Sequence, residues 1–399
     1  MNRKIIVLTL LFTIVAGTNN MVFAADSLTE QFGIQVSGDA TFILQGTSKL
    51  NNTTESNNGE NDATYSFDLK LTKDFGNDGK IVLGFEGGRG LGLSQKLDTY
   101  AAVNIDADNT VNTAAGYVQP KITQLFYEKS FLNKKLIANF GKLNFGSYFT
   151  GNNYAGDGAQ QFVTESFAGD PLVENPGQRV ALRLNYAVCN NIDVSCAYFT
   201  TDVNHFDTKG VGIIQATYKH SPNGNYRVYA WTNNGDHYSF KNNNEKSGIH
   251  SIGISADQAI NEEIGVFARL AYKDPSVYST KLETDPSTQK ETEKLNAPTS
   301  LFWSIGGQLK GSAWSRAKDV VGLALGQIYT SSDARGKTLY DYENIKDGAE
   351  TQIELYYKFA LNKHLALTPA LQYFVNPKGG NAAIDKNIIV YGIRTQIDF

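Results

Sequence analysis

Hydrophobic and polar residues alternate along most of this chain with a period of two, which is the spacing of a β-strand. The C-terminal stretch, residues 387–399, shows the pattern clearly. Ile389 and Tyr391 fall on one parity and Arg394 on the other, and the chain stops on the aromatic residue Phe399. A strand with one apolar and one mostly polar face that ends on an aromatic is typical of the closing strand of a transmembrane β-barrel.

The same alternation recurs along the chain and predicts sixteen strands. They are expected at residues 34–44, 64–75, 80–90, 122–131, 135–143, 180–188, 192–200, 211–219, 225–234, 247–257, 263–273, 301–311, 318–328, 349–360, 363–375 and 387–399. An even number of antiparallel strands brings both ends of a barrel to the same rim. We therefore predict an all-β fold, an antiparallel transmembrane β-barrel of 16 strands whose last strand pairs with the first.

The links between the expected strands alternate in length. Tight turns such as Asn190-Asn191 follow the even-numbered strands. Longer links follow the odd-numbered strands, at residues 45–63, 91–121, 144–179, 201–210, 235–246, 274–300, 329–348 and 376–386. Short turns on the periplasmic rim and long loops on the extracellular rim are the porin arrangement. The alternative, a soluble β-sandwich, has no reason to sort its loops by length.

The N-terminus has the features of a secretory signal peptide. Arg3 and Lys4 precede an apolar run at residues 5–16, and small residues follow near position 24. An uncleaved membrane anchor is the alternative, but a run of about a dozen residues is too short to span a bilayer. We predict a signal peptide at residues 1–24 and an outer-membrane barrel domain at residues 25–399, in a Gram-negative-type bacterium.

Charge and cysteine content narrow the possible ligands. The formal net charge is −4, and loss of Arg3 and Lys4 gives −4 − 2 = −6, which disfavours a nucleic-acid partner. Cys189 and Cys196 flank a tight turn, so they stand too far apart along the two strands for a disulfide within the hairpin. Neither has a histidine neighbour that would suggest a metal site. We expect no cofactor and no metal.

The third long link, which we call loop 3, combines glycine, amide and aromatic residues. Phe145, Phe149, Phe162 and Phe167 need an apolar surface to pack on, and the barrel interior offers one. A loop folded into the lumen narrows the channel and governs its selectivity. The alternative is an external loop that packs on its neighbours. The candidate constriction residues are Lys142, Asn152, Asn153, Tyr154, Asp157, Gln160 and Arg179.

Four stretches carry a family resemblance. The segment F-G-K-L-N-F-G-S-Y-F-T-G-N-N-Y-A-G-D-G-A-Q-Q-F at 140–162, followed by segments at 224–237, 306–327 and 365–381, resembles the carbohydrate-selective porins of the OprB type. The resemblance implies a sixteen-stranded outer-membrane barrel that passes sugars by diffusion. It also implies that Phe399 serves as the terminal signal for the barrel-assembly machinery. Some relatives pass inorganic ions, so the solute stays open.

Strand parity assigns the charged residues to the lumen, because an Arg or Lys facing lipid at mid-bilayer costs about 2–4 kcal/mol. The solute-facing lumen candidates are Arg183, Arg227, Tyr229, Trp231, Arg269, Glu128, Glu354, Gln372 and Arg394. Arg227, Tyr229 and Trp231 share one face, which makes them the best candidate for a sugar-facing patch. The alternative for each charge is an ordinary pair with a neighbouring strand.

These observations predict an outer-membrane diffusion channel, or porin, for small hydrophilic solutes, and carbohydrates above all. An ion-selective or general porin of the same fold is the alternative, followed by a structural or adhesion barrel. We do not expect an enzyme, because the five histidines lie in loops, turns or strand ends without a catalytic motif. Expected partners are sugars, outer-membrane lipid and a second and third copy in a homotrimer. The mixed-charge link 274–300 is expected to be a solvated loop or a receptor surface.

Overall fold

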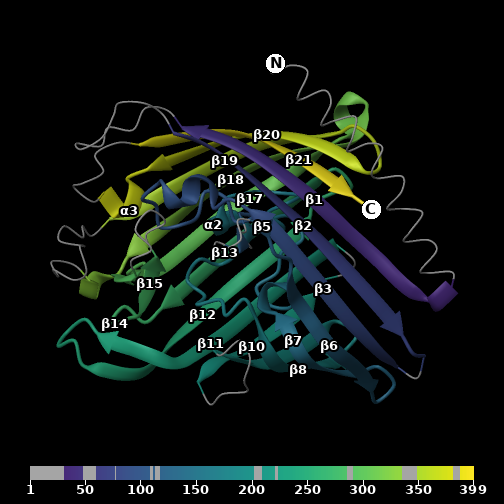
Figure 1. The fold of residues 1–399 in the computed structure, drawn as a ribbon, viewed down its shortest axis with the longest axis horizontal. Helices are drawn as coiled ribbons and strands as arrows, with labels where there is room; N and C mark the ends of the chain where they lie inside the picture. Colours follow the sequence, from purple (N-terminus) through teal and green to yellow (C-terminus); the bar gives the residue numbers. More distant parts are fainter. Residues whose placement is uncertain are drawn as a thin grey trace.

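The computed structural model describes residues 31–47, 60–76, 78–107, 111–112, 117–201, 209–220, 223–284, 291–334, 348–380 and 387–399. The predicted signal peptide lies outside them. Sixteen antiparallel strands form the wall of a barrel (Figure 1). They are β1 (Ile34–Thr47), β2 (Asn61–Asp74), β3 (Gly79–Arg89), β6 (Lys121–Phe131), β7 (Leu136–Asn144), β8 (Gln178–Cys189), β9 (Ile192–Thr200), β10 (Gly210–Lys219), β11 (Gly224–Ser239), β12 (Glu245–Ala259), β13 (Ile264–Lys273), β17 (Thr299–Gly311), β18 (Arg316–Thr330), β19 (Ala349–Ala360), β20 (Leu365–Val375) and β21 (Ile388–Asp398).

The first and last strands close the ring. β1 pairs with β21 in an antiparallel register that runs from Asp39 opposite Asp398 to Thr47 opposite Val390. The main chains of Gly38 and Phe399 exchange hydrogen bonds of 3.0 and 2.9 Å. Every wall strand therefore has a partner on both sides, and no edge is left for aggregation. The predicted sixteen-stranded antiparallel barrel is confirmed.

The two faces of each strand follow the predicted parity. On β21, Ile389 and Tyr391 are exposed on the outer face, whereas Arg394 points inward and is 5% exposed. On β8, Leu182 and Leu184 are exposed and Arg183 points inward. Outward-facing aromatic residues lie near strand ends, as expected for interfacial girdles: Tyr127, Phe131, Tyr186, Tyr218 and Phe359.

The sorting of the links by length is confirmed, with one correction. The seven links that follow even-numbered wall strands are two or four residues long. On the other rim, we expected a long link at 235–246, but β11 extends to Ser239 and β12 begins at Glu245, which leaves residues 240–244. The extended strands continue their ladder beyond the wall, because each added residue pair forms further main-chain hydrogen bonds.

The link 274–300 is also more ordered than its composition suggested. It contains β14 (Val277–Tyr278), which pairs with the end of β11, and a hairpin of β15 (Thr280–Thr284) and β16 (Glu291–Leu295). The composition of this link has no strand pattern, so these short strands were not predicted. A long connection has to satisfy its own main-chain donors and acceptors, and pairing with itself and with β11 does so.

Elsewhere the links contain short elements. β4 (Val111–Asn112) pairs with β5 (Tyr117–Val118), and short helical turns include η1 (Gly92–Gln95), α2 (Glu165–Ala168) and α3 (Pro377–Gly380). None of the helices in the described residues is long and apolar enough to cross a membrane. Cys189 and Cys196 are both free and exposed.

Candidate functional site

Loop 3, residues 145–177, lies against the inner face of the barrel wall. Phe145 and Phe149 pack on Phe199 of β9, with ring centroids 5.3 and 6.3 Å apart. Further along, Phe162 packs on Tyr356 of β19 at 5.0 Å. Each of these rings is at most 2% exposed to solvent. The apolar residues of loop 3 therefore find their packing surface on the inward-facing side chains of the wall.

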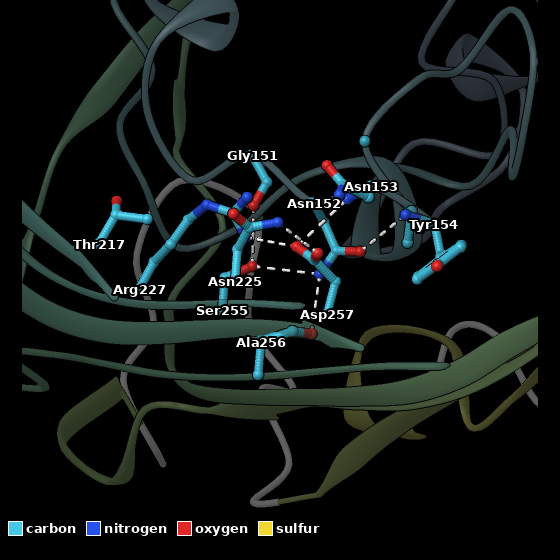
Figure 2. Close-up of polar contacts among 12 residues, drawn as sticks. Gly151, Asn152, Asn153, Tyr154, Thr217, Asn225, Arg227, Ser255, Ala256 and Asp257 are labelled. Carbon is cyan, nitrogen blue, oxygen red and sulfur yellow. Dashed lines mark hydrogen bonds and ion pairs between the residues drawn. The ribbon is translucent and has the colours of Figure 1, made fainter. Parts of the chain in front are cut away.

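A polar network holds the first part of loop 3 to β11 and β12 (Figure 2). Asp257 is at its centre. Arg227 Nη1 forms an ion pair of 2.5 Å with Asp257 Oδ2, and Asn225 Nδ2 donates to Oδ1 at 2.8 Å. The main-chain N–H of Asn153 donates to Oδ2 at 3.3 Å. The Arg227 side chain is 11% exposed, so it is mainly a partner of this carboxylate.

Asn152 completes the network. Its Nδ2 donates to the carbonyl oxygen of Ala256 at 3.0 Å and to Ser255 Oγ at 3.3 Å, while its Oδ1 accepts from the main-chain N–H of Tyr154 at 3.0 Å. Figure 2 shows these side chains directed toward one another beneath the loop. The Tyr154 ring lies over Gly265 of β13, where an added Cβ would stand 2.1 Å from a ring carbon.

Four inward-facing wall residues bind the main chain or side chains of the long loops. Both oxygens of Glu354 accept from main-chain N–H groups, those of Val163 and Thr164, at 2.9 Å each. Arg269 donates to carbonyl oxygens of loop 3, with 2.8 Å to that of Phe167. The remaining two residues make three contacts. Arg394 Nη1 donates to the carbonyl oxygen of Gly158 at 2.7 Å, and Gln372 Nε2 donates to Thr164 Oγ1 at 2.7 Å and to the Val103 carbonyl oxygen at 2.8 Å.

These contacts change how the expected solute-facing residues are understood. Parity placed their side chains on the inner face, and that is where they lie. Loop segments cover six of them, so protein atoms surround them instead of open lumen: Tyr229, Trp231, Arg269, Glu354, Gln372 and Arg394. In particular, Tyr229 and Trp231 are 1% and 2% exposed, and they pack in the apolar cluster that includes Phe145 and Phe149.

The other expected residues keep more contact with solvent. Arg183 donates to Asn139 at 2.9 Å, and its guanidinium lies 4.5 Å from the ring centroid of Tyr148 in loop 3. Glu128 pairs with Lys80 at 2.9 Å. Arg183 with Asn139 and Glu128 with Lys80 are pairs between neighbouring strands, which is the alternative role expected for these charges.

The two candidates at the ends of loop 3 lie on different faces. Lys142 shares the outward-facing parity of Phe140 and lies outside the described linings of the cavities below. Arg179 shares the inward parity of Arg183. It donates from Nε to the carbonyl oxygen of Thr201 at 3.1 Å and lines the larger cavity.

A second inward segment was missed by the sequence analysis. Residues 90–107 follow β3, and Leu93, Leu97 and Val103 pack on Phe374 of β20 with almost no exposure. Buried apolar residues in a long link are the same signal that marked loop 3. Here they are more dispersed, so the signal was weaker.

A cavity of about 730 Å³ lies between these segments and other long loops of the same rim, and we call it the vestibule. Its lining is mostly polar and includes Tyr100, Glu174, Arg179, His237 and Lys273. Glu174 Oε2 lies 2.9 Å from His237 Nε2. Burial alone would raise the pKa of Glu174, but hydrogen bonds from His237 and Asn233 and the charge on Lys273 outweigh it and hold the pKa below its usual value.

A second cavity of about 490 Å³, which we call the inner chamber, lies on the other side of loop 3. Asp157 and Gln160 line it. In loop 3, Asp157 Oδ1 accepts from the main-chain N–H groups of Ala159 and Gln160 at 2.9 and 3.0 Å. The vestibule and the inner chamber share three lining residues, Glu165, Val173 and Asn175. The two cavities therefore lie next to each other at this point of loop 3, which we call the junction.

A closed barrel wall with short turns on one rim, long loops on the other and polar cavities on either side of an inward loop is the architecture of an outer-membrane diffusion channel. The chain belongs to the family described as carbohydrate-selective porin, OprB family, whose model matches residues 52–399. The protein is thus a porin of the Gram-negative outer membrane.

Solved structures agree with this fold. The chain is similar to the high-pH structure of Pseudomonas putida OprB, with 18% identity, coverage of 94% of this chain and 96% of that chain, and a TM-score of 0.73. The outer-membrane channel DcaP of Acinetobacter baumannii is similar with 12% identity, coverage of 92% and 97%, and a TM-score of 0.55. An anion-selective porin from Comamonas acidovorans follows with 10% identity, coverage of 92% and 99%, and a TM-score of 0.54. No curated protein matches the sequence.

Proposed function

We propose that small neutral sugars cross the outer membrane through this barrel by way of the vestibule, the junction and the inner chamber. The observation that carries the proposal is the set of lining residues, Glu165, Val173 and Asn175, that the two cavities share. A vestibule of about 730 Å³ lies in the size range of small-molecule sites, about 300–1,000 Å³. Its carboxylate, amide and hydroxyl groups match the hydroxyl groups of a sugar, and each contact is weak enough to let the solute leave.

The test is solute flux together with pore conductance. Purified protein in planar bilayers should show discrete open channels, and proteoliposomes should swell in glucose faster than in a larger oligosaccharide. Asn175→Trp should lower sugar flux severalfold, because Asn175 is exposed at the junction and a bulky ring there narrows the path. Asn244→Trp, in the link between β11 and β12, is the matched control.

The alternatives give different results. A folded protein without conductance would rule out a diffusion channel and favour a structural or adhesion barrel. Open channels whose current no sugar alters would favour an ion-selective or general porin. We propose no catalytic activity. His237, a histidine in the vestibule lining, forms hydrogen bonds with Glu174 and with the carbonyl oxygen of Gly235. Among the described residues, no group of three His, Cys, Asp or Glu side chains could hold a metal ion.

Three further assignments belong to this proposal. Residues 1–24 act as a cleaved signal peptide, which N-terminal sequencing of outer-membrane protein tests. Phe399 directs the chain to the assembly machinery. The barrel forms a homotrimer in the lipid bilayer, supported by an outer-face groove beside Leu44, Gly46 and Tyr391 and by the likeness to OmpT of Vibrio cholerae, which is described in a trimer form. Native mass spectrometry of the detergent-solubilised protein would show the oligomer directly.

A further inference from the structure

The inner chamber is lined by acidic side chains that come from separate parts of the chain. Asp39 and Asp68 project from β1 and β2, Asp106 comes from the link after β3, and Asp157 and Glu165 come from loop 3. Asp170 of loop 3 is also part of the lining. None of the described residues that line this chamber is a lysine or an arginine.

Two buried arginines of the wall, Arg269 and Arg394, bind the main chain of loop 3 and interact with carboxylates around them. Arg269 donates to loop 3 carbonyl groups and interacts electrostatically with Asp170. Arg394 donates to Gly158 and interacts with Glu354, which is fully buried on the same wall. Arg394 also interacts with Asp106 and Asp157 of the chamber. The described lining nevertheless has six carboxyl groups and no lysine or arginine, so we assign the sign of the potential beside the passage to the carboxylates.

The surroundings of Asp106 point the same way. Ser66 Oγ donates to Asp106 Oδ2 at 3.0 Å and holds this carboxyl beside Asp68 on the inner face of β2. Burial is the main cause that raises the pKa of Asp106 to about 7, against the hydrogen bond from Ser66 and the charge of Arg394, and the negative charges of Asp39 and Asp68 add a smaller contribution in the same direction as burial. Carboxylates of the chamber are thus close enough to affect one another.

The acidic lining continues at both ends of the chamber. Glu165 lies at the junction with the vestibule. On the periplasmic side a third cavity, of about 360 Å³, shares Asp39 and Asp68 with the chamber and is also lined by Asp398. Lys70 is the basic residue among the described lining of this third cavity. A solute that follows the route passes a carboxylate at each transition between cavities.

We propose that the channel selects by charge: it favours cations and amino sugars, passes neutral sugars and rejects sugars that carry a carboxylate or phosphate. This inference rests on the proposed route and adds the sign of its electrostatic filter. A narrow passage walled by low-dielectric protein and lined by one sign of charge concentrates counter-ions by roughly tenfold or more. Asp68, Asp106 and Glu165 are the residues that set this preference.

Reversal potentials in a KCl gradient across a planar bilayer test the proposal. We expect the permeability for K⁺ to exceed that for Cl⁻ by about tenfold at low salt. The ratio should fall toward the ratio of free mobilities at about 1 M salt, where the Debye length is about 3 Å. This salt dependence needs no variant. An open channel that prefers Cl⁻, or that shows no preference at low salt, would overturn the charge filter while leaving the diffusion channel in place.

A matched set of variants locates the effect. Combined Asp68→Asn, Asp106→Asn and Glu165→Gln should reduce the K⁺/Cl⁻ ratio severalfold, whereas Glu262→Gln, in the short turn between β12 and β13, should not. Proteoliposome swelling gives an independent reading: glucosamine should enter faster than glucose, and glucuronate more slowly. Equal rates for the three sugars would contradict charge selection even though sugar passage stands. Failure of all three to enter would contradict the route itself.

Discussion

The phenol hydroxyl of Tyr229 donates a hydrogen bond of 2.5 Å to Oδ2 of Asp170. This contact joins the inner face of β11 to the part of loop 3 that lines the inner chamber. Asp170 is buried, with 8% of its surface exposed, and this burial raises its pKa. The main-chain N–H of Leu172 donates to its other oxygen at 2.9 Å. The carboxyl group is therefore a fixed structural element of loop 3 that depends on a tyrosine from the wall.

Tyr229→Phe should destabilise the packed position of loop 3. The variant removes the hydroxyl donor and leaves a buried acceptor of Asp170 unsatisfied, which costs about 1–3 kcal/mol. Single-channel recordings should show more frequent conductance fluctuations than in the native protein. Tyr226→Phe is the matched control, since Tyr226 lies on the same strand with its hydroxyl on Gln258 at the exposed outer face. Equal gating noise in the two variants would contradict this role of Tyr229.

Glu354→Gln should also loosen loop 3. Both carboxylate oxygens accept from main-chain N–H groups, so the amide nitrogen of glutamine would place a donor against a donor. Hydrogen bonds to a charged group contribute about 1.5–3 kcal/mol. We expect faster proteolysis within loop 3 in detergent and a lower temperature for the conversion from folded to unfolded band on gels. Glu262→Gln should leave both measurements at the native value.

The charge filter should depend on pH through Asp106. Burial raises the pKa of Asp106 to about 7, so this carboxyl is mostly neutral below that pH and negative above it. The K⁺/Cl⁻ permeability ratio should therefore rise between about pH 6 and about pH 8. Asp106→Asn removes the titrating group and should flatten this part of the profile. A native rise that persists in Asp106→Asn would assign it to another group.

Deletion of Phe399 should impair assembly more than conductance. Its main chain pairs with Gly38 across the closing strands, and its ring lies over Gly38, where an added Cβ would stand 2.5 Å from a ring carbon. The amount of folded protein in the outer membrane should fall severalfold, while the molecules that do insert conduct normally. Phe131→Ala, at another outward-facing aromatic near a strand end, is the control. Normal assembly of the truncated chain would argue against a terminal signal.

The placement of the strands could be predicted from the sequence because a barrel wall repeats one local rule. Each wall strand has one face toward lipid and one toward the interior, so apolar and polar residues alternate with a period of two. Ile389, Tyr391 and Arg394 express that rule within one strand, and the turn at Asn190-Asn191 marks where a strand must reverse. Such information is contained in neighbouring residues, and the sequence alone was sufficient to assign sixteen strands, their faces and the rim of each link.

The composition of loop 3 indicated only that it needs a surface. Phe145 and Phe162 showed that the loop had to pack, but their partners, Phe199 and Tyr356, come from distant strands. Strand parity did not indicate that Glu354 and Arg394 would bind the main chain of loop 3. Parity gives the direction of a side chain and carries no information about what covers it.

The sequence by itself thus determined the barrel, its number of strands and the membrane that such a surface requires, since these follow from local periodicity and the cost of charge in lipid. Only the tertiary structure decided which charges remain beside the route. Arg269 and Arg394 donate hydrogen bonds to the main chain of loop 3, whereas Asp68, Asp106 and Glu165 line the inner chamber. That outcome depends on how two long links fold inside a closed ring, and long-range packing of this kind leaves no periodic trace in the chain.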